Sequence, residues 1–143
     1  VINLEVGIAR DYPFHFSSTH REDISLGDGV SLVVYDGSML PDQDLLAYLS
    51  DVATRHQIPF QREFTPHYGE DGCQLQASGT GLPVINLGIP VRYAHSSHGM
   101  IDSKDVLGAV ELVYQAIMEF DEGAVSRIVR EPTAFAEGSA GYF

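Results

Sequence analysis

The sequence has a single cysteine, Cys73, and few basic residues, with 8 lysines and arginines against 20 aspartates and glutamates. One cysteine cannot form a disulfide within the chain, so we expect a reducing compartment such as the cytoplasm. The formal net charge of −12 disfavours nucleic acid as a partner, because binding to phosphates needs clustered lysine and arginine side chains. The acidic balance is otherwise compatible with a soluble intracellular enzyme.

The sequence also lacks long apolar stretches. None approaches the roughly 20 residues that a transmembrane helix needs, and there is no charged start followed by an apolar signal core. We therefore expect a soluble protein with no membrane partner. We find no repeat, no low-complexity segment and no phosphate-binding loop. The 143 residues, 44% of them hydrophobic, are enough for one domain with its own core.

The stretch at residues 81–105 organises the predicted fold. Residues 84–89 are dominated by β-branched and large apolar side chains, which predicts a strand that is covered on both faces. Arg92 and His95 follow this strand, at the point where open α/β sheets bind their ligands. His95 is therefore a candidate metal ligand or acid-base residue. A solvated loop histidine is the alternative, and residue type alone favours it.

Strands and helices alternate along the rest of the chain. Strand patterns occupy residues 2–9, 30–35 and 60–65, and helical spacing of apolar residues occupies a segment opening at Pro41, residues 103–120 and a shorter piece at residues 123–130. Asp102 or Ser103 is the expected cap of the helix at residues 103–120. This alternation predicts a layered α/β domain, with a sheet flanked by helices.

Glu5 lies in the middle of the predicted strand at residues 2–9. A carboxylate in that position must be exposed on an edge, paired or bound to a metal ion, because an isolated buried charge costs too much free energy. The residue pattern alone favours a solvated face. The long loop predicted at residues 10–29 contains His15 and His20, for which solvated side chains are again favoured over metal ligation.

A second group of metal-ligand residue types occurs where a turn enters a short helix. Its members are His67, Glu70, Asp71 and Cys73. Their spacing matches no zinc-binding motif. We expect a glycine-flanked turn in which the Asp71 side chain caps the helix by accepting backbone N–H groups.

Several short motifs follow one another in an order that resembles a known family. The motif after the central strand is I-P-V-R-Y-A-H-S at residues 89–96. The others are Glu5-Val6, Asp11-Tyr12-Pro13, Gly27-Asp28-Gly29, Ile58-Pro59-Phe60-Gln61, Gly69-Glu70-Asp71-Gly72, Ile101-Asp102 and Asp105. Together they cover about residues 1–120 and resemble the glutamyl or deblocking aminopeptidases, the tetrahedral metallopeptidases that include cellulase-M-like proteins. Each motif is weak alone, and their shared order makes the match specific.

The resemblance implies part of a zinc-exopeptidase-like catalytic domain that uses two divalent metal ions, zinc or cobalt, to hydrolyse peptides from the N-terminus. Carried over by position, Glu5 is the acidic metal ligand and His95 the histidine ligand. The resemblance places Gly69, Asp71 and Arg92 on the substrate side. The guanidinium of Arg92 would orient the turn or an upstream carboxylate, and a surface ion pair is the alternative.

The remaining ligands of the family have no counterpart in this sequence. The H-T-D stretch, the bridging aspartate and the Glu-Glu pair with the catalytic base would precede Val1, and the chain also begins without methionine. We therefore expect residues 1–143 to be the C-terminal portion of a metallo-aminopeptidase catalytic domain, inactive on its own. Its expected partners are a peptide substrate, the upstream part of the same protein and further copies in a homo-oligomer.

The sequence departs from the family at three places. Glu5 stands where aspartate is usual, Gly99 stands where glutamate is common, and the usual Gly-Gly-Thr-Asp is replaced by Y-G-E-D at residues 68–71. The last change affects the substrate pocket, so no side-chain preference is carried over. Two alternatives stay open, namely a non-catalytic α/β interaction or scaffold domain derived from a peptidase, and a related zinc exopeptidase of another branch.

Overall fold

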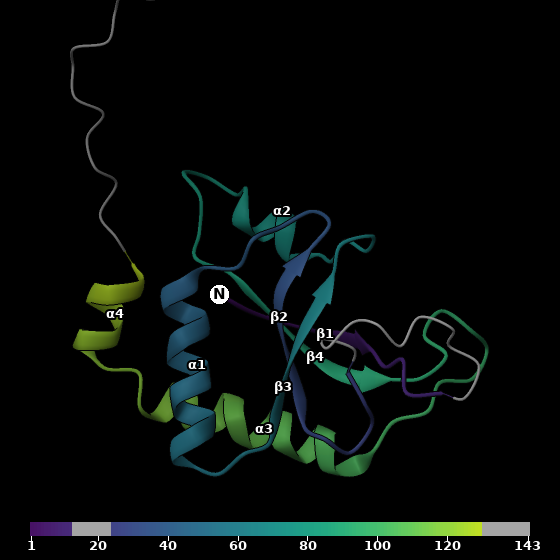
Figure 1. The fold of residues 1–143 in the computed structure, drawn as a ribbon. Coiled ribbons are helices and arrows are strands. Elements are labelled where there is room, and N and C mark those ends of the chain that lie inside the picture. Colours follow the sequence, from purple (N-terminus) through teal and green to yellow (C-terminus); the bar gives the residue numbers. More distant parts are fainter. Residues whose placement is uncertain (13–23, 130–143) are drawn as a thin grey trace, which may run out of the picture.

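The computed structural model describes residues 1–12 and 24–129. These residues form strands β1 (Ile2–Ile8), β2 (Val30–Asp36), β3 (Phe60–Thr65) and β4 (Ile85–Val91) and helices α1 (Gln43–Arg55), α2 (Gly72–Gln76), α3 (Ser103–Met118) and α4 (Glu122–Ile128) (Figure 1). The predicted α/β class and the order of its elements are confirmed, and the bounds differ from the predicted ones by a few residues at the ends of the elements.

The strands form one mixed sheet in the order β1-β4-β2-β3. β1 pairs with β4 in parallel, from Ile2 opposite Ile85 to Ile8 opposite Val91. β2 also pairs with β3 in parallel, but β2 runs antiparallel to β4. The carboxyl ends of β1 and β4 therefore point one way and those of β2 and β3 the other (Figure 1). The central strand β4 is buried along nearly its whole length, as predicted.

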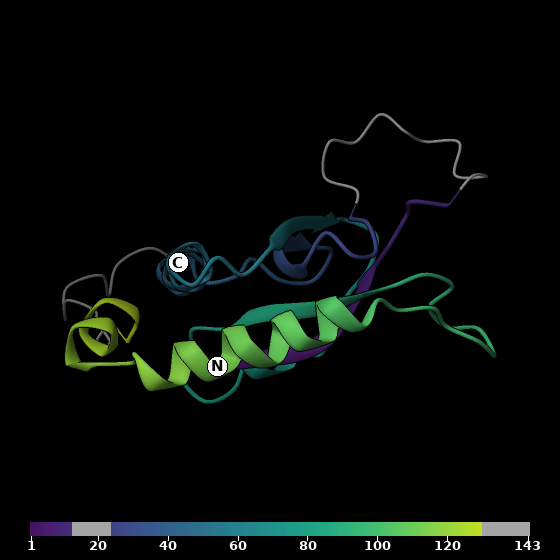
Figure 2. The same cartoon turned by 90° about the horizontal axis from the view of Figure 1, so that it is seen from below.

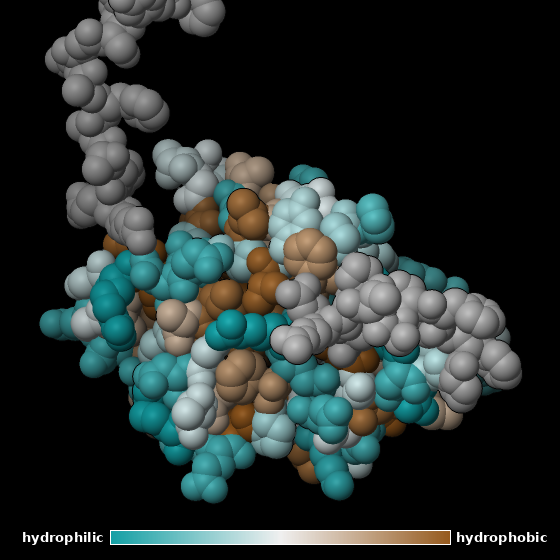
Figure 3. All heavy atoms as spheres, in the orientation of Figure 1, coloured by the Kyte–Doolittle hydropathy of each residue, from teal (hydrophilic) through white to brown (hydrophobic). Residues whose placement is uncertain are grey.

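Helices α1 and α3 pack on one face of the sheet and form the main core there. Figure 2 shows α3 lying along the part of the sheet made by β1 and β4. The core is made of buried apolar side chains from both layers, among them Leu32, Leu87, Leu49, Val52 and Leu112. On the face seen in Figure 3, hydrophobic side chains gather between α1 and the strands, with hydrophilic ones around them. Removal of this apolar surface from water is the main force holding the layers together.

An aspartate caps the N-terminus of each of the two long helices, α1 and α3. The Asp102 side chain accepts the N–H of Lys104 at 2.8 Å, which confirms the predicted cap of α3. The Asp42 side chain accepts the N–H of Leu45 at 2.8 Å, so α1 begins after Asp42 rather than at Pro41. Each cap satisfies a backbone donor that the first helical turn leaves unpaired.

Asp105, in the first turn of α3, is fully buried and holds a loop that is distant in the sequence. Its carboxylate accepts the N–H of Gly27 at 2.8 Å and that of Gly29 at 3.0 Å. Gly29 has φ +106°, and a Cβ there would lie 2.2 Å from the carbonyl oxygen of Pro59. Only glycine suits that position. Asp105 therefore fixes the loop that leads into β2.

The other face of the sheet buries polar side chains. Glu63 is 1% exposed; its carboxylate accepts the N–H of Ile8 at 2.8 Å and the hydroxyl of Ser31. Asp36 accepts the side-chain amide of Asn86 at 3.0 Å. Burial raises the pKa of Glu63, although its hydrogen bonds oppose the shift. These side chains are held by hydrogen bonds because buried polar groups without partners are unstable.

Glu70 is the exception among these buried acids. It is 6% exposed, and neither carboxylate oxygen has a hydrogen-bond partner. Burial, reinforced by the charges of Glu63 and Asp36, raises its pKa to about 8. The amide of Asn86 opposes this shift weakly, but its hydrogen bond goes to Asp36. Glu70 is therefore largely protonated at neutral pH.

An apolar surface remains uncovered beside α3. We call it the α3–β1 surface; its members are Leu4, Val6, Leu107, Val110, Tyr114 and Ile117, all exposed. Leu4 is opposite Leu87, on the side of the sheet that the helices cover, and Ile117 is 66% exposed. A cluster of this kind is typical of an interface.

None of the helices in the described part of the chain is long and apolar enough to cross a membrane.

We predict that Asp105→Ala lowers the free energy of unfolding by about 2–4 kcal/mol, because it leaves two backbone N–H groups without an acceptor, one of them deeply buried. Urea denaturation at neutral pH measures the loss. The adjacent, exposed Lys104→Ala is the control and should change stability by less than about 0.5 kcal/mol. Equal effects of the two substitutions would contradict the role given to Asp105.

We also predict that Glu70 makes the protein less stable as the pH rises. The folded state keeps the proton up to a pKa of about 8, whereas the ordinary value is 4.5. Between these values the folded state binds more protons than the unfolded state, so this contribution is full below the lower value and is lost as the pH rises through the upper one.

Glu70→Gln should therefore flatten the fall in unfolding free energy between about pH 5 and 9 and should stabilise the protein at the alkaline end. Urea denaturation in the presence of a chelator, repeated across this range, measures the effect. Glu111→Gln, at an exposed position of α3, is the control. The same pH dependence in the unmodified protein and in Glu70→Gln would show that Glu70 is not the buried acid responsible.

Candidate metal-binding site

Glu5 lies on the polar face of the sheet, in the middle of β1. Side chains alternate along a strand, so Glu5 points away from the face that carries Leu4 and Val6. It is half-buried, and its Oε1 accepts the side-chain amide of Asn3 at 3.1 Å and the N–H of Asp71 at 3.3 Å. Its carboxylate therefore accepts hydrogen bonds from neutral donors.

His95 lies in the loop after β4 and is exposed. The backbones of Tyr93 and His95 both adopt left-handed conformations, with φ +61° and +59°. The Ser96 hydroxyl lies 2.7 Å from the carbonyl oxygens of both Tyr93 and His98, and its one proton, donated to either of them, stabilises the turn. Left-handed non-glycine residues are uncommon and cluster at functional sites, because the surrounding structure must hold them there.

The segment at residues 68–71 contacts both Glu5 and His95. The Tyr68 hydroxyl lies 2.6 Å from Nε2 of His95, and the N–H of Asp71 donates to Glu5. Burial, followed by the charges of Glu70 and Glu5, raises the pKa of Tyr68. The phenol therefore stays protonated at neutral pH. The structure thus brings this one segment against both of the predicted ligands.

Tyr68 is the residue of this site that sequence reasoning missed. Its only signal was that a large aromatic residue stands where the resembled motif has glycine. The predicted cap at Asp71 is wrong, because Asp71 occupies the N-cap position of α2 without a side-chain cap bond. Its side chain is instead exposed, as is Gly69. The substrate roles assigned to Gly69 and Asp71 stay predictions.

Arg92 connects the ends of β1 and β4. Its Nε and Nη2 each lie 2.6 Å from a carboxylate oxygen of Asp11, and Asp11 also accepts the N–H of Leu26 at 3.0 Å. The hydrogen bond from Arg92 is the main reason why the pKa of Asp11 is lowered. The two hydrogen bonds between the Arg92 guanidinium and the Asp11 carboxylate form an ion pair, which was the alternative to a role in orienting the turn. A substrate role for Arg92 stays a prediction.

Glu5 and His95 are of residue types that bind metal ions, but two ligands are too few to hold one. A carboxylate and an imidazole are normal zinc ligands, and a zinc site needs at least three protein ligands. Across residues 1–12 and 24–129, no three histidine, cysteine, aspartate or glutamate side chains are grouped closely enough to hold an ion. His15 and His20 lie outside the described residues. Glu5 and His95 therefore fit part of a metal site.

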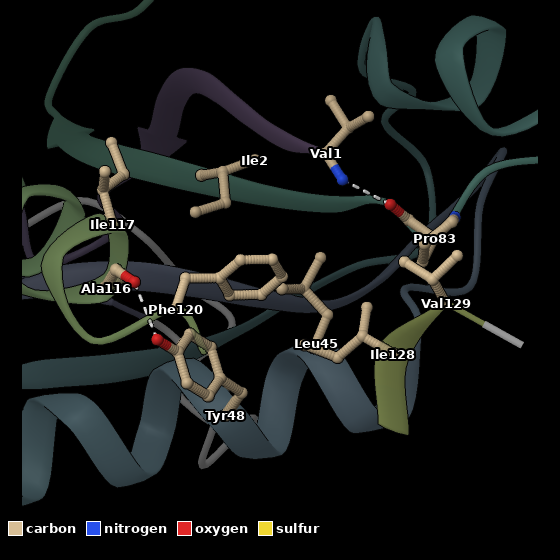
Figure 4. A pocket seen from close by; sticks show the side chains of 10 residues that line it. All are labelled: Val1, Ile2, Leu45, Tyr48, Pro83, Ala116, Ile117, Phe120, Ile128 and Val129. Atoms are coloured by element: carbon tan, nitrogen blue, oxygen red, sulfur yellow. Dashed lines mark hydrogen bonds between the residues drawn. The ribbon is translucent and has the colours of Figure 1, made fainter. Parts of the chain in front are cut away.

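The apolar hollow of the molecule lies away from these residues. Its volume is about 430 Å³, and its walls come from β1, α1, α3 and α4. Figure 4 shows Tyr48, Leu45, Phe120 and Ile128 around it, with Val1 at one end. The hollow is at the start of β1, whereas His95 follows the end of the parallel strand β4. We assign no chemistry to it, because its lining is mainly apolar.

Known proteins are similar to this chain over most of its length. Residues 1–112 match the family described as M42 glutamyl aminopeptidase. A lysyl aminopeptidase of Pyrococcus furiosus is 32% identical over 121 residues, which are 82% of this chain and 34% of that protein. The chain thus spans about a third of the length of the curated relatives it matches, 34% in each of two cases.

Two solved structures share the fold. A TET aminopeptidase from the marine sediment archaeon Thaumarchaeota archaeon SCGC AB-539-E09 has a TM-score of 0.80 and 34% identity, over 87% of this chain and 34% of its own. An aminopeptidase of the archaeon Desulfurococcus kamchatkensis has a TM-score of 0.82 at 22% identity, over 93% of this chain and 38% of its own. The second likeness concerns the fold alone. With residues 1–112 matched, this chain belongs to the M42 glutamyl aminopeptidase family.

Proposed function

We propose that residues 1–143 form the C-terminal portion of the catalytic domain of a metal-dependent aminopeptidase, which removes N-terminal residues from peptides. The observation that carries this proposal is the contact of one segment, residues 68–71, with both Glu5 and His95 in a member of the M42 family. The protein would act in the cytoplasm, in keeping with its single cysteine.

Two divalent metal ions, zinc or cobalt, are part of this proposal. Glu5 would hold one ion through an anionic oxygen, and His95 would hold the other through a neutral imidazole nitrogen. The chemistry that such ions supply is activation of the scissile carbonyl and of a water molecule. Gly69 and Asp71, both exposed, would face the substrate, and Arg92 would support the site through its pair with Asp11.

Residues upstream of Val1 would complete the site and cover the α3–β1 surface. Three observations support this. The relatives are about three times longer, since the chain spans 34% of them. The described residues supply two suitable donors where a zinc ion needs at least three. The α3–β1 surface is exposed, with Leu107 67% and Val110 63% accessible.

We predict that Glu5→Gln and His95→Ala each reduce the metal content and lower kcat/KM by more than about 100-fold in a protein that includes the upstream residues. Loss of an outer-shell partner costs about 10- to 100-fold, and loss of a ligand should cost more. Metal analysis and release of the N-terminal residue from peptides measure the two effects.

The matched control for His95 is His98→Ala, three residues further along the same loop, where the imidazole is exposed and hydrogen-bonds to Ser97. Its activity should be close to that of the unmodified protein. Residues 1–143 alone should release no N-terminal residue with either metal. Full activity in His95→Ala would overturn the ligand assignment and would favour a non-catalytic scaffold domain.

We also predict that residues 1–143, produced alone, associate through the α3–β1 surface, because water contact with this apolar surface is unfavourable. Light scattering should give a mass above the 15.6 kDa of one chain. Val110→Lys combined with Ile117→Lys should return a single chain. Glu111→Lys, at an exposed position of the same helix, changes the charge without removing apolar surface and should leave the association intact. A monodisperse single chain before any substitution would contradict the prediction.

A further inference from the structure

A row of hydrogen-bonded side chains crosses the polar face of the sheet and ends at Glu5. Asn3 and Asn86 lie opposite each other in the parallel pairing of β1 with β4. The Nδ2 atom of Asn3 lies 3.1 Å from Oε1 of Glu5 and 3.0 Å from Oδ1 of Asn86. The Nδ2 atom of Asn86 donates in turn to Oδ2 of Asp36 at 3.0 Å. We call these four residues the polar row; it joins strands β1, β4 and β2.

The donors and acceptors at Asp36 fix the direction of every bond in the polar row. Its other oxygen, Oδ1, accepts the N–H and the hydroxyl of Ser38 at 2.7 and 2.6 Å. Because a carboxylate only accepts hydrogen bonds, Asn86 must turn its NH₂ group toward Asp36 and its carbonyl oxygen toward Asn3. Asn3 must then present its own NH₂ group, whose second hydrogen is donated to Glu5. The hydrogen bond to Glu5 thus depends on Asp36, which is two strands away in the sheet.

The middle of the polar row is buried, which keeps its amides from turning over. Asn86 and Asp36 are both 0% exposed. The turn into α2 packs directly on Asn86, since a Cβ on Gly72 would overlap the Oδ1 atom of the amide. Reversal of the Asn86 amide would set its carbonyl oxygen against the Asp36 carboxylate, and unpaired polar groups are costly where water is excluded. Asn86 therefore keeps the orientation that serves Asn3.

We propose that Asn3 and Asn86 are positioning residues, which transmit the fixed orientation of Asp36 to Glu5 and hold its carboxylate in the candidate site. The inference rests on the proposed function, since it takes Glu5 as a residue of the reaction. The N–H of Asp71 approaches the same oxygen of Glu5, Oε1, at 3.3 Å. Accurate placement matters for a reacting site, because a displacement of about 1 Å can lower a rate about 100-fold.

Asp36→Asn should reverse the polar row without removing a side chain. The introduced amide keeps its oxygen on the N–H of Ser38 and turns its NH₂ group toward Asn86. Asn86 then turns its NH₂ group toward Asn3. The carbonyl oxygen of Asn3 would face Glu5, where the unmodified protein has a donor.

The double substitution Asp36→Asn with Asn86→Asp should restore the original direction. A carboxylate at position 86 accepts from the introduced amide on one side and from the NH₂ group of Asn3 on the other. Asn3 can then donate to Glu5 again. A simple packing defect would not be repaired by moving the carboxylate from one partner to the other.

The experiment follows the side-chain NH₂ groups of asparagine by NMR in residues 1–143. The sequence contains only two asparagines, Asn3 and Asn86, so ¹⁵N-asparagine gives two pairs of signals, and Asn3→Ala identifies one pair by its loss. In Asp36→Asn, the Asn3 hydrogens should exchange with solvent about fivefold faster, the factor that one ordinary hydrogen bond contributes to an equilibrium constant. The carboxyl carbon resonance of Glu5 should move in the same variant.

Three further variants complete the measurement. The double variant should return both observations to those of the unmodified protein. Asn3→Ala, at a half-buried position of β1, removes the last donor directly and should move the Glu5 resonance in its own right. Ser31→Ala is the matched control, because it removes a hydroxyl that donates to Glu63 on the same polar face but lies outside the polar row. It should leave the Asn3 and Glu5 signals unchanged.

The effect on the reaction is measured in a protein that includes the upstream residues. Asp36→Asn should lower kcat about 10- to 100-fold, the usual cost of losing a group that orients a site residue, with a smaller change in KM. The double variant should recover most of the loss.

The outcomes separate this inference from the proposed function. Unchanged Asn3 signals in Asp36→Asn would overturn the inference, as would a double variant that stays as impaired as the single one. A nearly normal kcat in Asp36→Asn, beside an inactive Glu5→Gln, would also overturn it and leave the proposed function standing. Full activity in Glu5→Gln would remove both the role of Glu5 and the inference that rests on it.

Discussion

The parallel pairing of β1 with β4 is the constraint on which the candidate site depends. It joins two segments that are more than 80 residues apart in the chain, with Glu5 opposite Gly88. A Cβ on Gly88 would lie 2.8 Å from the backbone nitrogen of Gly7, so the close approach of the strands requires glycine there. The pair of Arg92 and Asp11 closes one end of this pairing. The loop that carries His95 leaves from that same end.

The polar face of the sheet carries an energetic cost, because one of its buried carboxyl groups has no hydrogen-bond partner. Glu63 and Asp36 are buried with hydrogen-bond partners, but Glu70 is buried without any. An unpartnered buried acid avoids the larger cost of a buried charge by keeping its proton, which is why its pKa is raised. The carboxyl group of Glu70 therefore makes no hydrogen bond that would offset its burial. Glu70 lies within the segment, residues 68–71, that contacts Glu5 and His95, and an unpartnered buried acid is typical of functional sites, where local rules are often broken.

On the helical face of the sheet, apolar side chains are exposed to water, because the described residues do not cover all of them. α3 buries Ala109, Leu112 and Ala116 against the sheet, while its next stripe continues into the exposed α3–β1 surface. A broad apolar arc of this kind is typical of a helix that is packed on two sides. The described residues thus leave the carboxyl group of Glu70 unpartnered on one face of the sheet and apolar side chains exposed on the other.

The sequence by itself determined the local structure and the class of the fold. The apolar run of β4, the helical spacing of α3 and the cap at Asp102 each depend on residues that are close in the chain, and all three were predicted. Glu5 could be singled out because a carboxylate in mid-strand is unusual. Its role came from the order of the motifs, since the residue pattern favoured a solvated face.

Only the tertiary structure decided which distant segments meet. The antiparallel pairing of β2 with β4, the bonds from Asp105 to Gly27 and Gly29, the contact of Tyr68 with His95 and the burial of Glu70 join residues that carry no local signal of one another. The sequence of residues 68–71 reads as a polar turn, and polar turns are normally solvated. Glu70 is buried because the turn folds over the polar face of the sheet, and that placement depends on packing between elements rather than on the propensities of the turn itself.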